Sequence, residues 1–430
     1  MSVTLQRVFN VRREEVLPVV LAMLFFFCVL TALMMLRPAR EALGMRGGLD
    51  AVRWLFVGTA LVSLLLNPVF GWLVSRFRRT VFIAVTYLFF ALSLLGFHLM
   101  IVLAPEAIGV VSGQVFYVWF SVFNLFSAMV FWALMSDRFS LEQSKRFFAL
   151  IAVGGTLGAI VGPWLAAVLA APLGTPALLM VSSGFLVLGL CAALALMRIQ
   201  PAQPLPGHPP NAPVTTQPEI IGGSAWEGIR AVVRSRYLSG IAAYVLILAV
   251  MATFLYFTRL QMVAALDQDL DARTALFARI DVITQVSTLL IQVLVSGHLM
   301  KRFGVPLTLS LLPLVTLFGF IGLAVMGSLL ALIVVESAFK AVQRAVMRPA
   351  RETLFTVIST EEKYKAKALI DTFVYRFGDV AGAQLEGVLG RLGAGLTAVA
   401  SVAAPLALVW IALAFYLGRA QQARAQADTE

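Results

Sequence analysis

Residues Val19–Leu36 read VVLAMLFFFCVLTALMML and contain no charged side chain. A helix needs roughly 20 residues of this kind to cross the hydrocarbon core of a bilayer. Further charge-free stretches follow at Trp54–Ser75, Thr80–Pro105, Ala107–Ser136 and Phe147–Met197. The last is long enough for two spans, which the Pro/Gly cluster from Ala171 to Pro176 divides. The sequence therefore predicts an all-α, polytopic membrane protein.

The composition excludes a soluble protein. Of the 430 residues, 60% are hydrophobic and 13% are charged, and the mean hydropathy is +0.91. The net charge of +11 does not indicate a nucleic acid polymer as partner, because the basic residues lie mainly at the ends of the apolar spans. Cys28 and Cys191 lie within apolar spans and the three histidines are scattered, so we expect neither a metal site nor a cofactor.

Basic residues mark alternate loops of the predicted bundle. Lys and Arg follow every second span, whereas the connections near Pro105, Pro172 and Gly327 have none. By the positive-inside rule both termini are cytoplasmic, which requires an even number of spans. The second half is predicted to contain spans at Tyr237–Thr258, Thr274–Leu299, Val305–Met326, Leu329–Phe355, Lys367–Leu389 and Gly395–Gly418. We therefore expect about twelve helices in a bacterial inner membrane.

A proline-rich segment separates two halves. Residues 1–198 are predicted to form an N-terminal six-helix half and residues 237–418 a C-terminal one, with a cytoplasmic tail at 419–430. The linker between them, 199–236, has seven prolines within Ile199–Ser224 and cannot bury a core. At its end Trp226 and Val233 alternate with arginines, which predicts a basic amphipathic helix on the inner membrane surface.

A short internal repeat relates the two halves. Gly71–Phe77 reads GWLVSRF after the second span, and Gly297–Phe303 reads GHLMKRF after the eighth. These paired Gly-x-Leu-x-x-Arg-Phe segments resemble the loop motif of the major facilitator superfamily. Ser75 and Lys301 stand where that motif usually has an acidic residue. The resemblance implies a secondary transporter whose two six-helix halves alternate access to a midplane site.

The tenth predicted span carries a charged side chain at every fourth position. An ionisable group inside a membrane costs about 2.5 to 3.5 kcal/mol, so such groups indicate a binding site or an ion pair. The four residues are Glu336, Lys340, Arg344 and Arg348. We expect the three cations to bind an anionic substrate and Glu336 to couple or gate. Alternatively, Glu336 and Lys340 form a structural pair, and Arg348 and Arg351 reach the cytoplasmic interface.

The eleventh span repeats this spacing with acidic residues. Asp371, Tyr375 and Asp379 lie four residues apart, with Arg376 beside them and Glu386 further along. Tyr375 and Arg376 are candidate substrate contacts, and either aspartate could couple transport to a proton. The alternative is that cations of the tenth span simply neutralise Asp371 or Asp379.

The end of the first span contains a second anion-binding pattern. Leu36–Glu41 reads LRPARE, in which Arg37 and Arg40 lie three residues apart and can face one anion, with Glu41 next to them. This pattern, together with Lys367–Asp379, resembles the nucleotide transporter family, the ATP/ADP translocases of plastids and intracellular bacteria. The resemblance implies that Arg40 contacts substrate, although that family often has lysine there, and that nucleotides are exchanged.

Other polar residues give weaker signals. Asn124 of the fourth span, near Gln114 and Tyr117, is a further candidate for the substrate cavity, although polar residues at helix contacts are equally expected. A segment with Asp267, Asp269 and Asp271 is flanked by Arg259 and Arg279, and Asp281 enters the next span. We interpret this segment mostly as a solvated outer loop with interfacial ion pairs.

These patterns together predict a secondary transporter of an organic anion, with a nucleotide or another phosphorylated solute as the first candidate. The coupling ion, a proton or a counter-substrate, stays open. No nucleophile motif and no metal-ligand set is present, so we expect no enzyme. Two alternatives remain: a proton-coupled exporter of drugs or lipid-like molecules, and a non-transporting membrane scaffold or sensor.

Overall fold

The structure is a computed structural model that describes most of the chain. The described residues are 12–76, 78–103, 109–199, 225–266, 269–295, 299–359, 362, 366–367, 369–392 and 395–427. The proline-rich linker from residue 200 to 224, the start of the second loop repeat at Gly297, and Asp267 lie outside them.

Within these residues the chain is helical and forms no strand. The first half contains α2 (Arg13–Gly44), η1 (Met45–Gly47), α3 (Gly48–Arg76), α4 (Arg79–Leu103), α5 (Gly109–Arg138), α6 (Leu141–Leu173) and α7 (Thr175–Arg198). The second contains α8 (Ala225–Arg234), α9 (Arg236–Leu266), α10 (Leu270–Val295), α11 (Leu299–Met326), α12 (Leu329–Val342), η2 (Gln343–Met347), α13 (Arg348–Leu354), η3 (Ile370–Val374), α15 (Tyr375–Arg391) and α16 (Gly395–Ala427). The predicted all-α architecture is confirmed.

Nine helical segments among the described residues are long and apolar enough to cross a membrane. The first of them, Glu14–Leu66, contains both α2 and most of α3. The tenth and eleventh predicted spans are not among the nine, because a π-helical segment divides each of them and both carry several charges. When α2 and α3 are counted separately and the tenth and eleventh spans are included, the architecture agrees with the predicted polytopic bundle.

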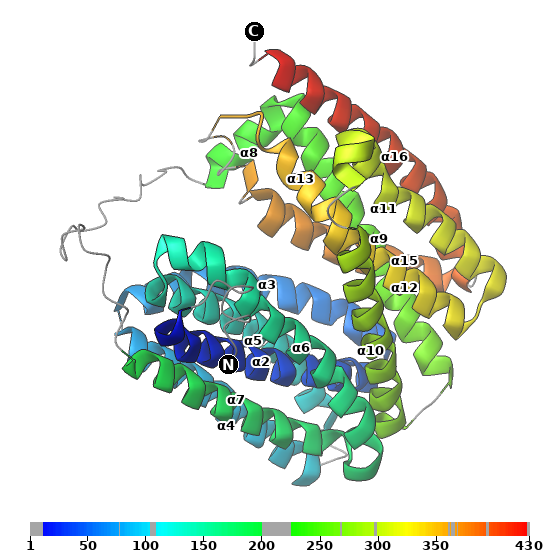
Figure 1. Ribbon diagram of the computed structural model, residues 1–430. Helices are drawn as coiled ribbons and strands as arrows, with labels where there is room; N and C mark the ends of the chain where they lie inside the picture. Colours follow the sequence, from blue (N-terminus) through cyan, green and yellow to red (C-terminus); the bar gives the residue numbers. More distant parts are fainter. Residues whose placement is uncertain are drawn as a thin grey trace, which may run out of the picture. The chain divides into compact units, whose positions relative to one another are not determined.

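The described helices pack into two compact units. Unit 1 contains α2 to α7, the end of α9 from Val263 and the start of α10 up to Val282. Unit 2 contains α8, the rest of α9, and the chain from Ile283 onward. Figure 1 shows the helices of each unit with their labels.

Glycines of α6 allow close helix packing in unit 1. A Cβ on Gly158 would lie 2.5 Å from the carbonyl oxygen of Phe27, and one on Gly162 would lie 2.6 Å from that of Thr31. Because only glycine fits here, the backbone of α6 can approach that of α2 directly. Aromatic rings fill the space next to this contact, including Phe26 and Phe131, whose stacked ring centroids lie 4.0 Å apart.

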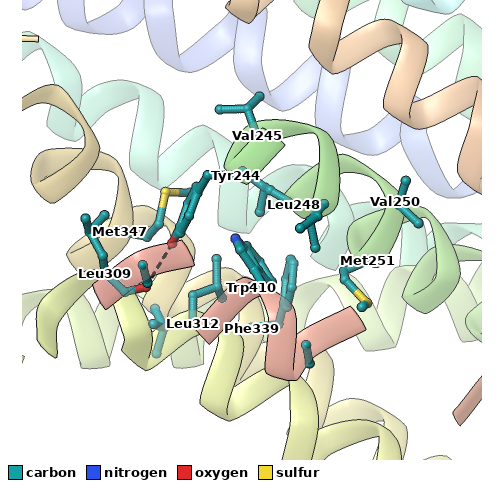
Figure 2. Close-up of a cluster of buried hydrophobic side chains, with 14 of the residues drawn as sticks. Tyr244, Val245, Leu248, Val250, Met251, Leu309, Leu312, Phe339, Met347 and Trp410 are labelled. Atoms are coloured by element: carbon teal, nitrogen blue, oxygen red, sulfur yellow. Dashed lines mark hydrogen bonds between the residues drawn. The ribbon is translucent and has the colours of Figure 1, made fainter. Parts of the chain in front are cut away.

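Unit 2 has a separate core centred on aromatic side chains. Tyr244 of α9 and Trp410 of α16 are fully buried, and their ring centroids lie 5.3 Å apart. The Tyr244 hydroxyl donates to the carbonyl oxygen of Leu309 at 2.8 Å, as Figure 2 shows. This bond satisfies a hydroxyl that has no water available inside a membrane-spanning bundle.

The two units use equivalent packing contacts. In unit 2, Gly378 and Gly382 of α15 lie against Ala249 and Thr253 of α9, just as the α6 glycines lie against α2. The pair α11 and α16 lies side by side in unit 2, as α4 and α7 do in unit 1 (Figure 1). In a plan of six plus six spans these are corresponding helices, so the packing agrees with the repeat seen in the loop segments.

Candidate functional site

A buried charge cluster joins α9 to α12 in unit 2. Arg259 donates from Nη1 to Oε1 of Glu336 at 3.0 Å, and Lys340, one turn further along α12, contacts the same oxygen. The side chains of Arg259 and Glu336 are 2% and 5% exposed, whereas that of Lys340 is 17% exposed. Two cations thus contact one carboxylate, and Lys340 is the more accessible of the two cations.

Arg259 corrects the sequence interpretation, which placed it in a solvated outer loop. Helix α9 continues without interruption to Leu266, so Arg259 lies inside the helix, nearly two turns before its end. Hydropathy ends a span at the first charged residue, and the partner that permits burial, Glu336, lies far away in the sequence. The local pattern therefore has no signal for a buried arginine at this position.

Arg344 extends the charged face of α12 into η2. Its Nη1 donates to Oε1 of Gln285 in α10 at 2.7 Å, a contact that orients the guanidinium without adding a negative charge. Arg348, the first residue of α13, is exposed and forms no ion pair or hydrogen bond with a described residue. Because the turn of η2 is wider than an α-helical turn, the four-residue stripe does not continue straight through to Arg348.

Asp371 lies in an ion network at the junction of the tenth and eleventh spans. Arg351 Nη1 lies 2.9 Å from Oδ1 of Asp371, and Arg351 Nη2 lies 3.6 Å from Oε1 of Glu352. Glu352 in turn contacts Lys367. This geometry matches the neutralisation that the sequence left open as the alternative role for Asp371. The cation that contacts it is Arg351, which was not among the candidate substrate contacts.

The second aspartate of the eleventh span has a more exposed partner. Arg376 donates from Nη1 to Oδ2 of Asp379 at 3.3 Å, and the Arg376 side chain is 40% exposed while that of Asp379 is 16% exposed. Tyr375 precedes Arg376 and is half-buried. Further along α15, Glu386 is buried and accepts a hydrogen bond from the side-chain amide of Gln261 in α9. Of these residues, Arg376 is the one most open to a solute.

Unit 1 holds Arg37 next to a buried acid of α10. Arg37 Nε lies 3.9 Å from Oδ2 of Asp281, whose side chain is 2% exposed. Asp271, at the start of α10, accepts a hydrogen bond at 2.6 Å from the backbone amide of Thr175, the first residue of α7. A carboxylate is favourable at such a helix N-terminus. Asp271 therefore lies in α10 rather than in a solvated loop, and Asp281 lies within the predicted span, where it contacts Arg37.

Arg40 is held between aromatic rings. Its guanidinium carbon lies 4.0 Å from the ring centroid of Tyr117 and 5.3 Å from that of Phe120, both in α5. Its Nη2 also lies 3.8 Å from the carboxylate of Glu41, which is 2% exposed. Asn124 lies two turns beyond Tyr117 on the same helix and is exposed. These cation–π contacts position the guanidinium, a group that can bind an anion through two parallel hydrogen bonds.

The arrangement is suited to binding anions. Lys340, Arg344 and Arg376 are partly exposed cations in helices expected to span the membrane, where the low dielectric strengthens their attraction to an anion. Among the described residues there is no group of three or more His, Cys, Asp or Glu that could hold a metal ion. Binding a charged solute and exchanging ion-pair partners are therefore the chemistry that these residues offer.

Comparisons with known proteins fit this bundle. The Major Facilitator Superfamily profile matches residues 19–347. Solved structures that share the fold include an auto-inhibited POT family peptide transporter (13% identity, 95% of this chain and 96% of that one, TM-score 0.61) and a bacterial homolog of the human lysosomal transporter Spinster (12%, 96% and 98%, 0.58).

The nucleoside transporter NupG has the same fold, at 16% identity over 95% of this chain and 99% of that one, with a TM-score of 0.55. No protein of curated function matches the chain by sequence. The superfamily profile covers well over half of the chain, including the first half from Val19 onward and the charged part of α12. The chain therefore belongs to the Major Facilitator Superfamily, a family of membrane transporters.

Proposed function

We propose that the protein is a secondary transporter of an organic anion that works by alternating access. The observation that supports this most strongly is the excess of cations in the membrane-spanning helices of unit 2. Arg259 and Lys340 both contact the single carboxylate of Glu336, and Arg344 follows one turn later. Ionisable side chains in a membrane span indicate a binding site or an ion pair, and Lys340 and Arg344 are also partly exposed. A bound anionic substrate would join the contacts that these two side chains already make.

The candidate contacts divide by how freely they can reach a solute. Arg259 is almost completely buried, so its role in the proposal is to position Glu336, whose carboxylate also contacts Lys340. Lys340, Arg344 and Arg376 are the direct anion contacts, and Arg348 is a further one because it is exposed. Tyr375, next to Arg376, would donate a hydrogen bond.

Unit 1 contains a cationic position of its own. Arg40, which lies over the ring of Tyr117, can present two parallel donors to a phosphate or carboxylate. Arg37 lies on α2 with Arg40, and Asn124 lies on α5 with Tyr117. A nucleotide or another phosphorylated solute is the first candidate, because the Arg37–Glu41 segment resembles the ATP/ADP translocases. The relatives of solved structure share 12–16% identity with this chain, so their likeness extends to the fold and the proposed substrate rests on these residues.

We propose Asp379 as the coupling carboxylate in preference to Asp371. Asp371 contacts Arg351 at 2.9 Å, whereas the partner of Asp379 is Arg376, which is 40% exposed and is itself a candidate substrate contact. A substrate anion that takes Arg376 away from Asp379 would favour protonation of the carboxylate. Glu41 and Glu336, which also contact cations, would gate by holding Arg40 and Lys340 when no substrate is bound. The proposed location is a bacterial inner membrane with both termini cytoplasmic, as the loop charges predict.

Counterflow in proteoliposomes tests the proposed function. Vesicles loaded with unlabelled nucleotides, sugar phosphates or inorganic phosphate are diluted into the same labelled compound, and transient accumulation is measured. We expect accumulation of at least one anion, and its loss in the variants Lys340→Gln and Arg344→Gln. Arg391→Gln is the matched control, because Arg391 is an exposed cation at the end of α15 that forms no ion pair with a described residue.

The same experiment separates the alternatives. A proton-coupled exporter of apolar compounds would keep its flux in Lys340→Gln and Arg344→Gln, and would show no counterflow of anions. A scaffold or sensor would show no flux of any compound. If no nucleotide accumulates but another anion does, the nucleotide proposal is wrong and the proposal of an anion transporter still holds.

A further inference from the structure

Helix α8 presents an apolar pair and several arginines outside the bundle. Val232 is 7% exposed and packs into the core of unit 2, which fixes the helix on that unit. Ile229 and Val233, one turn apart, are 38% and 73% exposed. Arg230 and Arg234, also one turn apart, are exposed beside them. The outer surface of α8 therefore combines apolar and cationic side chains.

Further arginines lie next to α8. Arg236 begins α9 and is exposed, and the guanidinium of Arg424, near the end of α16, lies 4.5 Å from the ring centroid of Tyr237. The start of α9 and the end of α16 are thus adjacent, at the end of unit 2 where Figure 1 shows α8. We call Arg230, Arg234, Arg236 and Arg424, together with Ile229 and Val233, the α8 surface. None of its four arginines forms an ion pair with a side chain that the structure describes.

We propose that the α8 surface binds the headgroups of anionic phospholipids. Guanidinium groups bind phosphate oxygens bidentately, and arginines next to a membrane span attract anionic lipid. Free phosphate would satisfy the arginines alone. The exposed Val233 and Ile229 favour the lipid, because they require an apolar environment that acyl chains provide and water does not. This site is independent of the proposed transport substrate.

Lipid bound here has a direct connection to the helices of the transport site. The Tyr237 hydroxyl donates to the carbonyl oxygen of Leu354, the last residue of α13, at 2.9 Å. The Ser239 hydroxyl donates to the carbonyl oxygen of Val232 at 2.6 Å and ties α8 to the first turn of α9. Headgroups that hold α8 on the membrane surface would therefore also stabilise the end of the tenth span.

Thermal unfolding of the full-length protein in detergent, with phosphatidylglycerol titrated in, tests the proposal. We expect phosphatidylglycerol to raise the Tm, and phosphatidylcholine and inorganic phosphate at equal concentration to raise it much less. Arg230→Gln with Arg234→Gln should raise the phosphatidylglycerol concentration for half-maximal effect about tenfold or more. Val233→Ser should weaken the lipid effect without changing any response to phosphate.

The control removes the same charge elsewhere. Arg46→Gln with Arg391→Gln changes two exposed arginines outside the α8 surface and should leave the titration unchanged. If both double variants shift the titration equally, or if inorganic phosphate matches phosphatidylglycerol, the proposal is wrong. Should the α8 variant unfold too early for a titration, counting the bound phosphatidylglycerol by native mass spectrometry gives the same comparison, and equal retention with wild type overturns the proposal.

Discussion

Replacing Glu336 by Gln should destabilise the protein strongly. Both Arg259 and Lys340 contact the Oε1 atom of this carboxylate, and Arg259 is 2% exposed. Removing one partner of a buried ion pair typically costs about 3–5 kcal/mol, because the remaining charge stays desolvated. Lys340 is 17% exposed and can turn towards water, so most of the cost comes from Arg259. We therefore expect a loss of about 3 kcal/mol in the free energy of unfolding.

Two comparison variants test whether the cost comes from the unpaired charge of Arg259. Lys340→Gln leaves the 3.0 Å contact between Arg259 and Glu336 in place, so it should cost about 1 kcal/mol or less. The triple variant Arg259→Met, Glu336→Leu and Lys340→Leu removes all three charges, and its stability should return to within about 1 kcal/mol of wild type.

Unfolding by sodium dodecyl sulfate in mixed micelles, followed by tryptophan fluorescence, measures these free energies. We expect Glu336→Gln to lose the most free energy of unfolding and Lys340→Gln to lose less, with the triple variant close to wild type. If Glu336→Gln is as stable as wild type, or if the triple variant is as unstable as Glu336→Gln, the cluster is not held together by the carboxylate as described.

Three further predictions concern packing and pairing. Gly158→Val should abolish or severely reduce folded protein in gel filtration, because even a Cβ would lie 2.5 Å from a backbone oxygen of α2, whereas Gly184→Ala, which meets nothing within 4 Å, should be tolerated. Arg351→Asp should reduce counterflow, and the charge swap with Asp371→Arg should restore a part of it; no restoration would contradict a pairwise role for the 2.9 Å contact. Tyr244→Phe should cost about 1 kcal/mol in sodium dodecyl sulfate unfolding, because a buried carbonyl of α11 loses its 2.8 Å donor, and an unchanged stability would argue that another donor replaces it.

The sequence predicted the architecture because hydropathy and loop charge are local signals. Each apolar span can be recognised without reference to any other, and the repeated loop segments at Gly71 and Gly297 then relate the halves. The bounds of α4 and α7 follow the charge-free stretches closely, since α4 begins at Arg79 and α7 lies between the Pro/Gly cluster and Arg198.

Pairing between distant residues could not be predicted in the same way. Arg259 and Glu336, or Arg37 and Asp281, lie far apart in the sequence, and nothing near either member shows that it is buried. The sequence therefore assigned Arg259 to a solvated region and named no partner for Asp281, which enters the eighth predicted span. A signal was available in principle: the predicted carboxylates and cations of the spans need partners, and an arginine next to a span is a candidate partner.

The sequence also did not predict the π-helical turns in the tenth and eleventh spans. The four-residue spacing from Glu336 to Arg348 assumed an unbroken α-helix, but η2 inserts a π-helical turn at Gln343–Met347. A second π segment at Ile370–Val374 contains Asp371. Such turns are frequent at functional sites, and no residue type in either segment requires them. The residue that contacts Asp371 is Arg351, which is not one of the four residues at the predicted spacing.

Equilibrium binding of a labelled anion tests the central claim most directly. Isothermal titration of the purified protein with the anion that gives the largest counterflow should show saturable binding. Arg344→Gln should weaken it about tenfold or more, as expected when one charge-assisted hydrogen bond of about 1.5–3 kcal/mol is lost, and Arg391→Gln should bind like wild type. Binding that is unchanged in Arg344→Gln, or equally weakened in Arg391→Gln, would contradict an anion site at the charged face of α12 and η2.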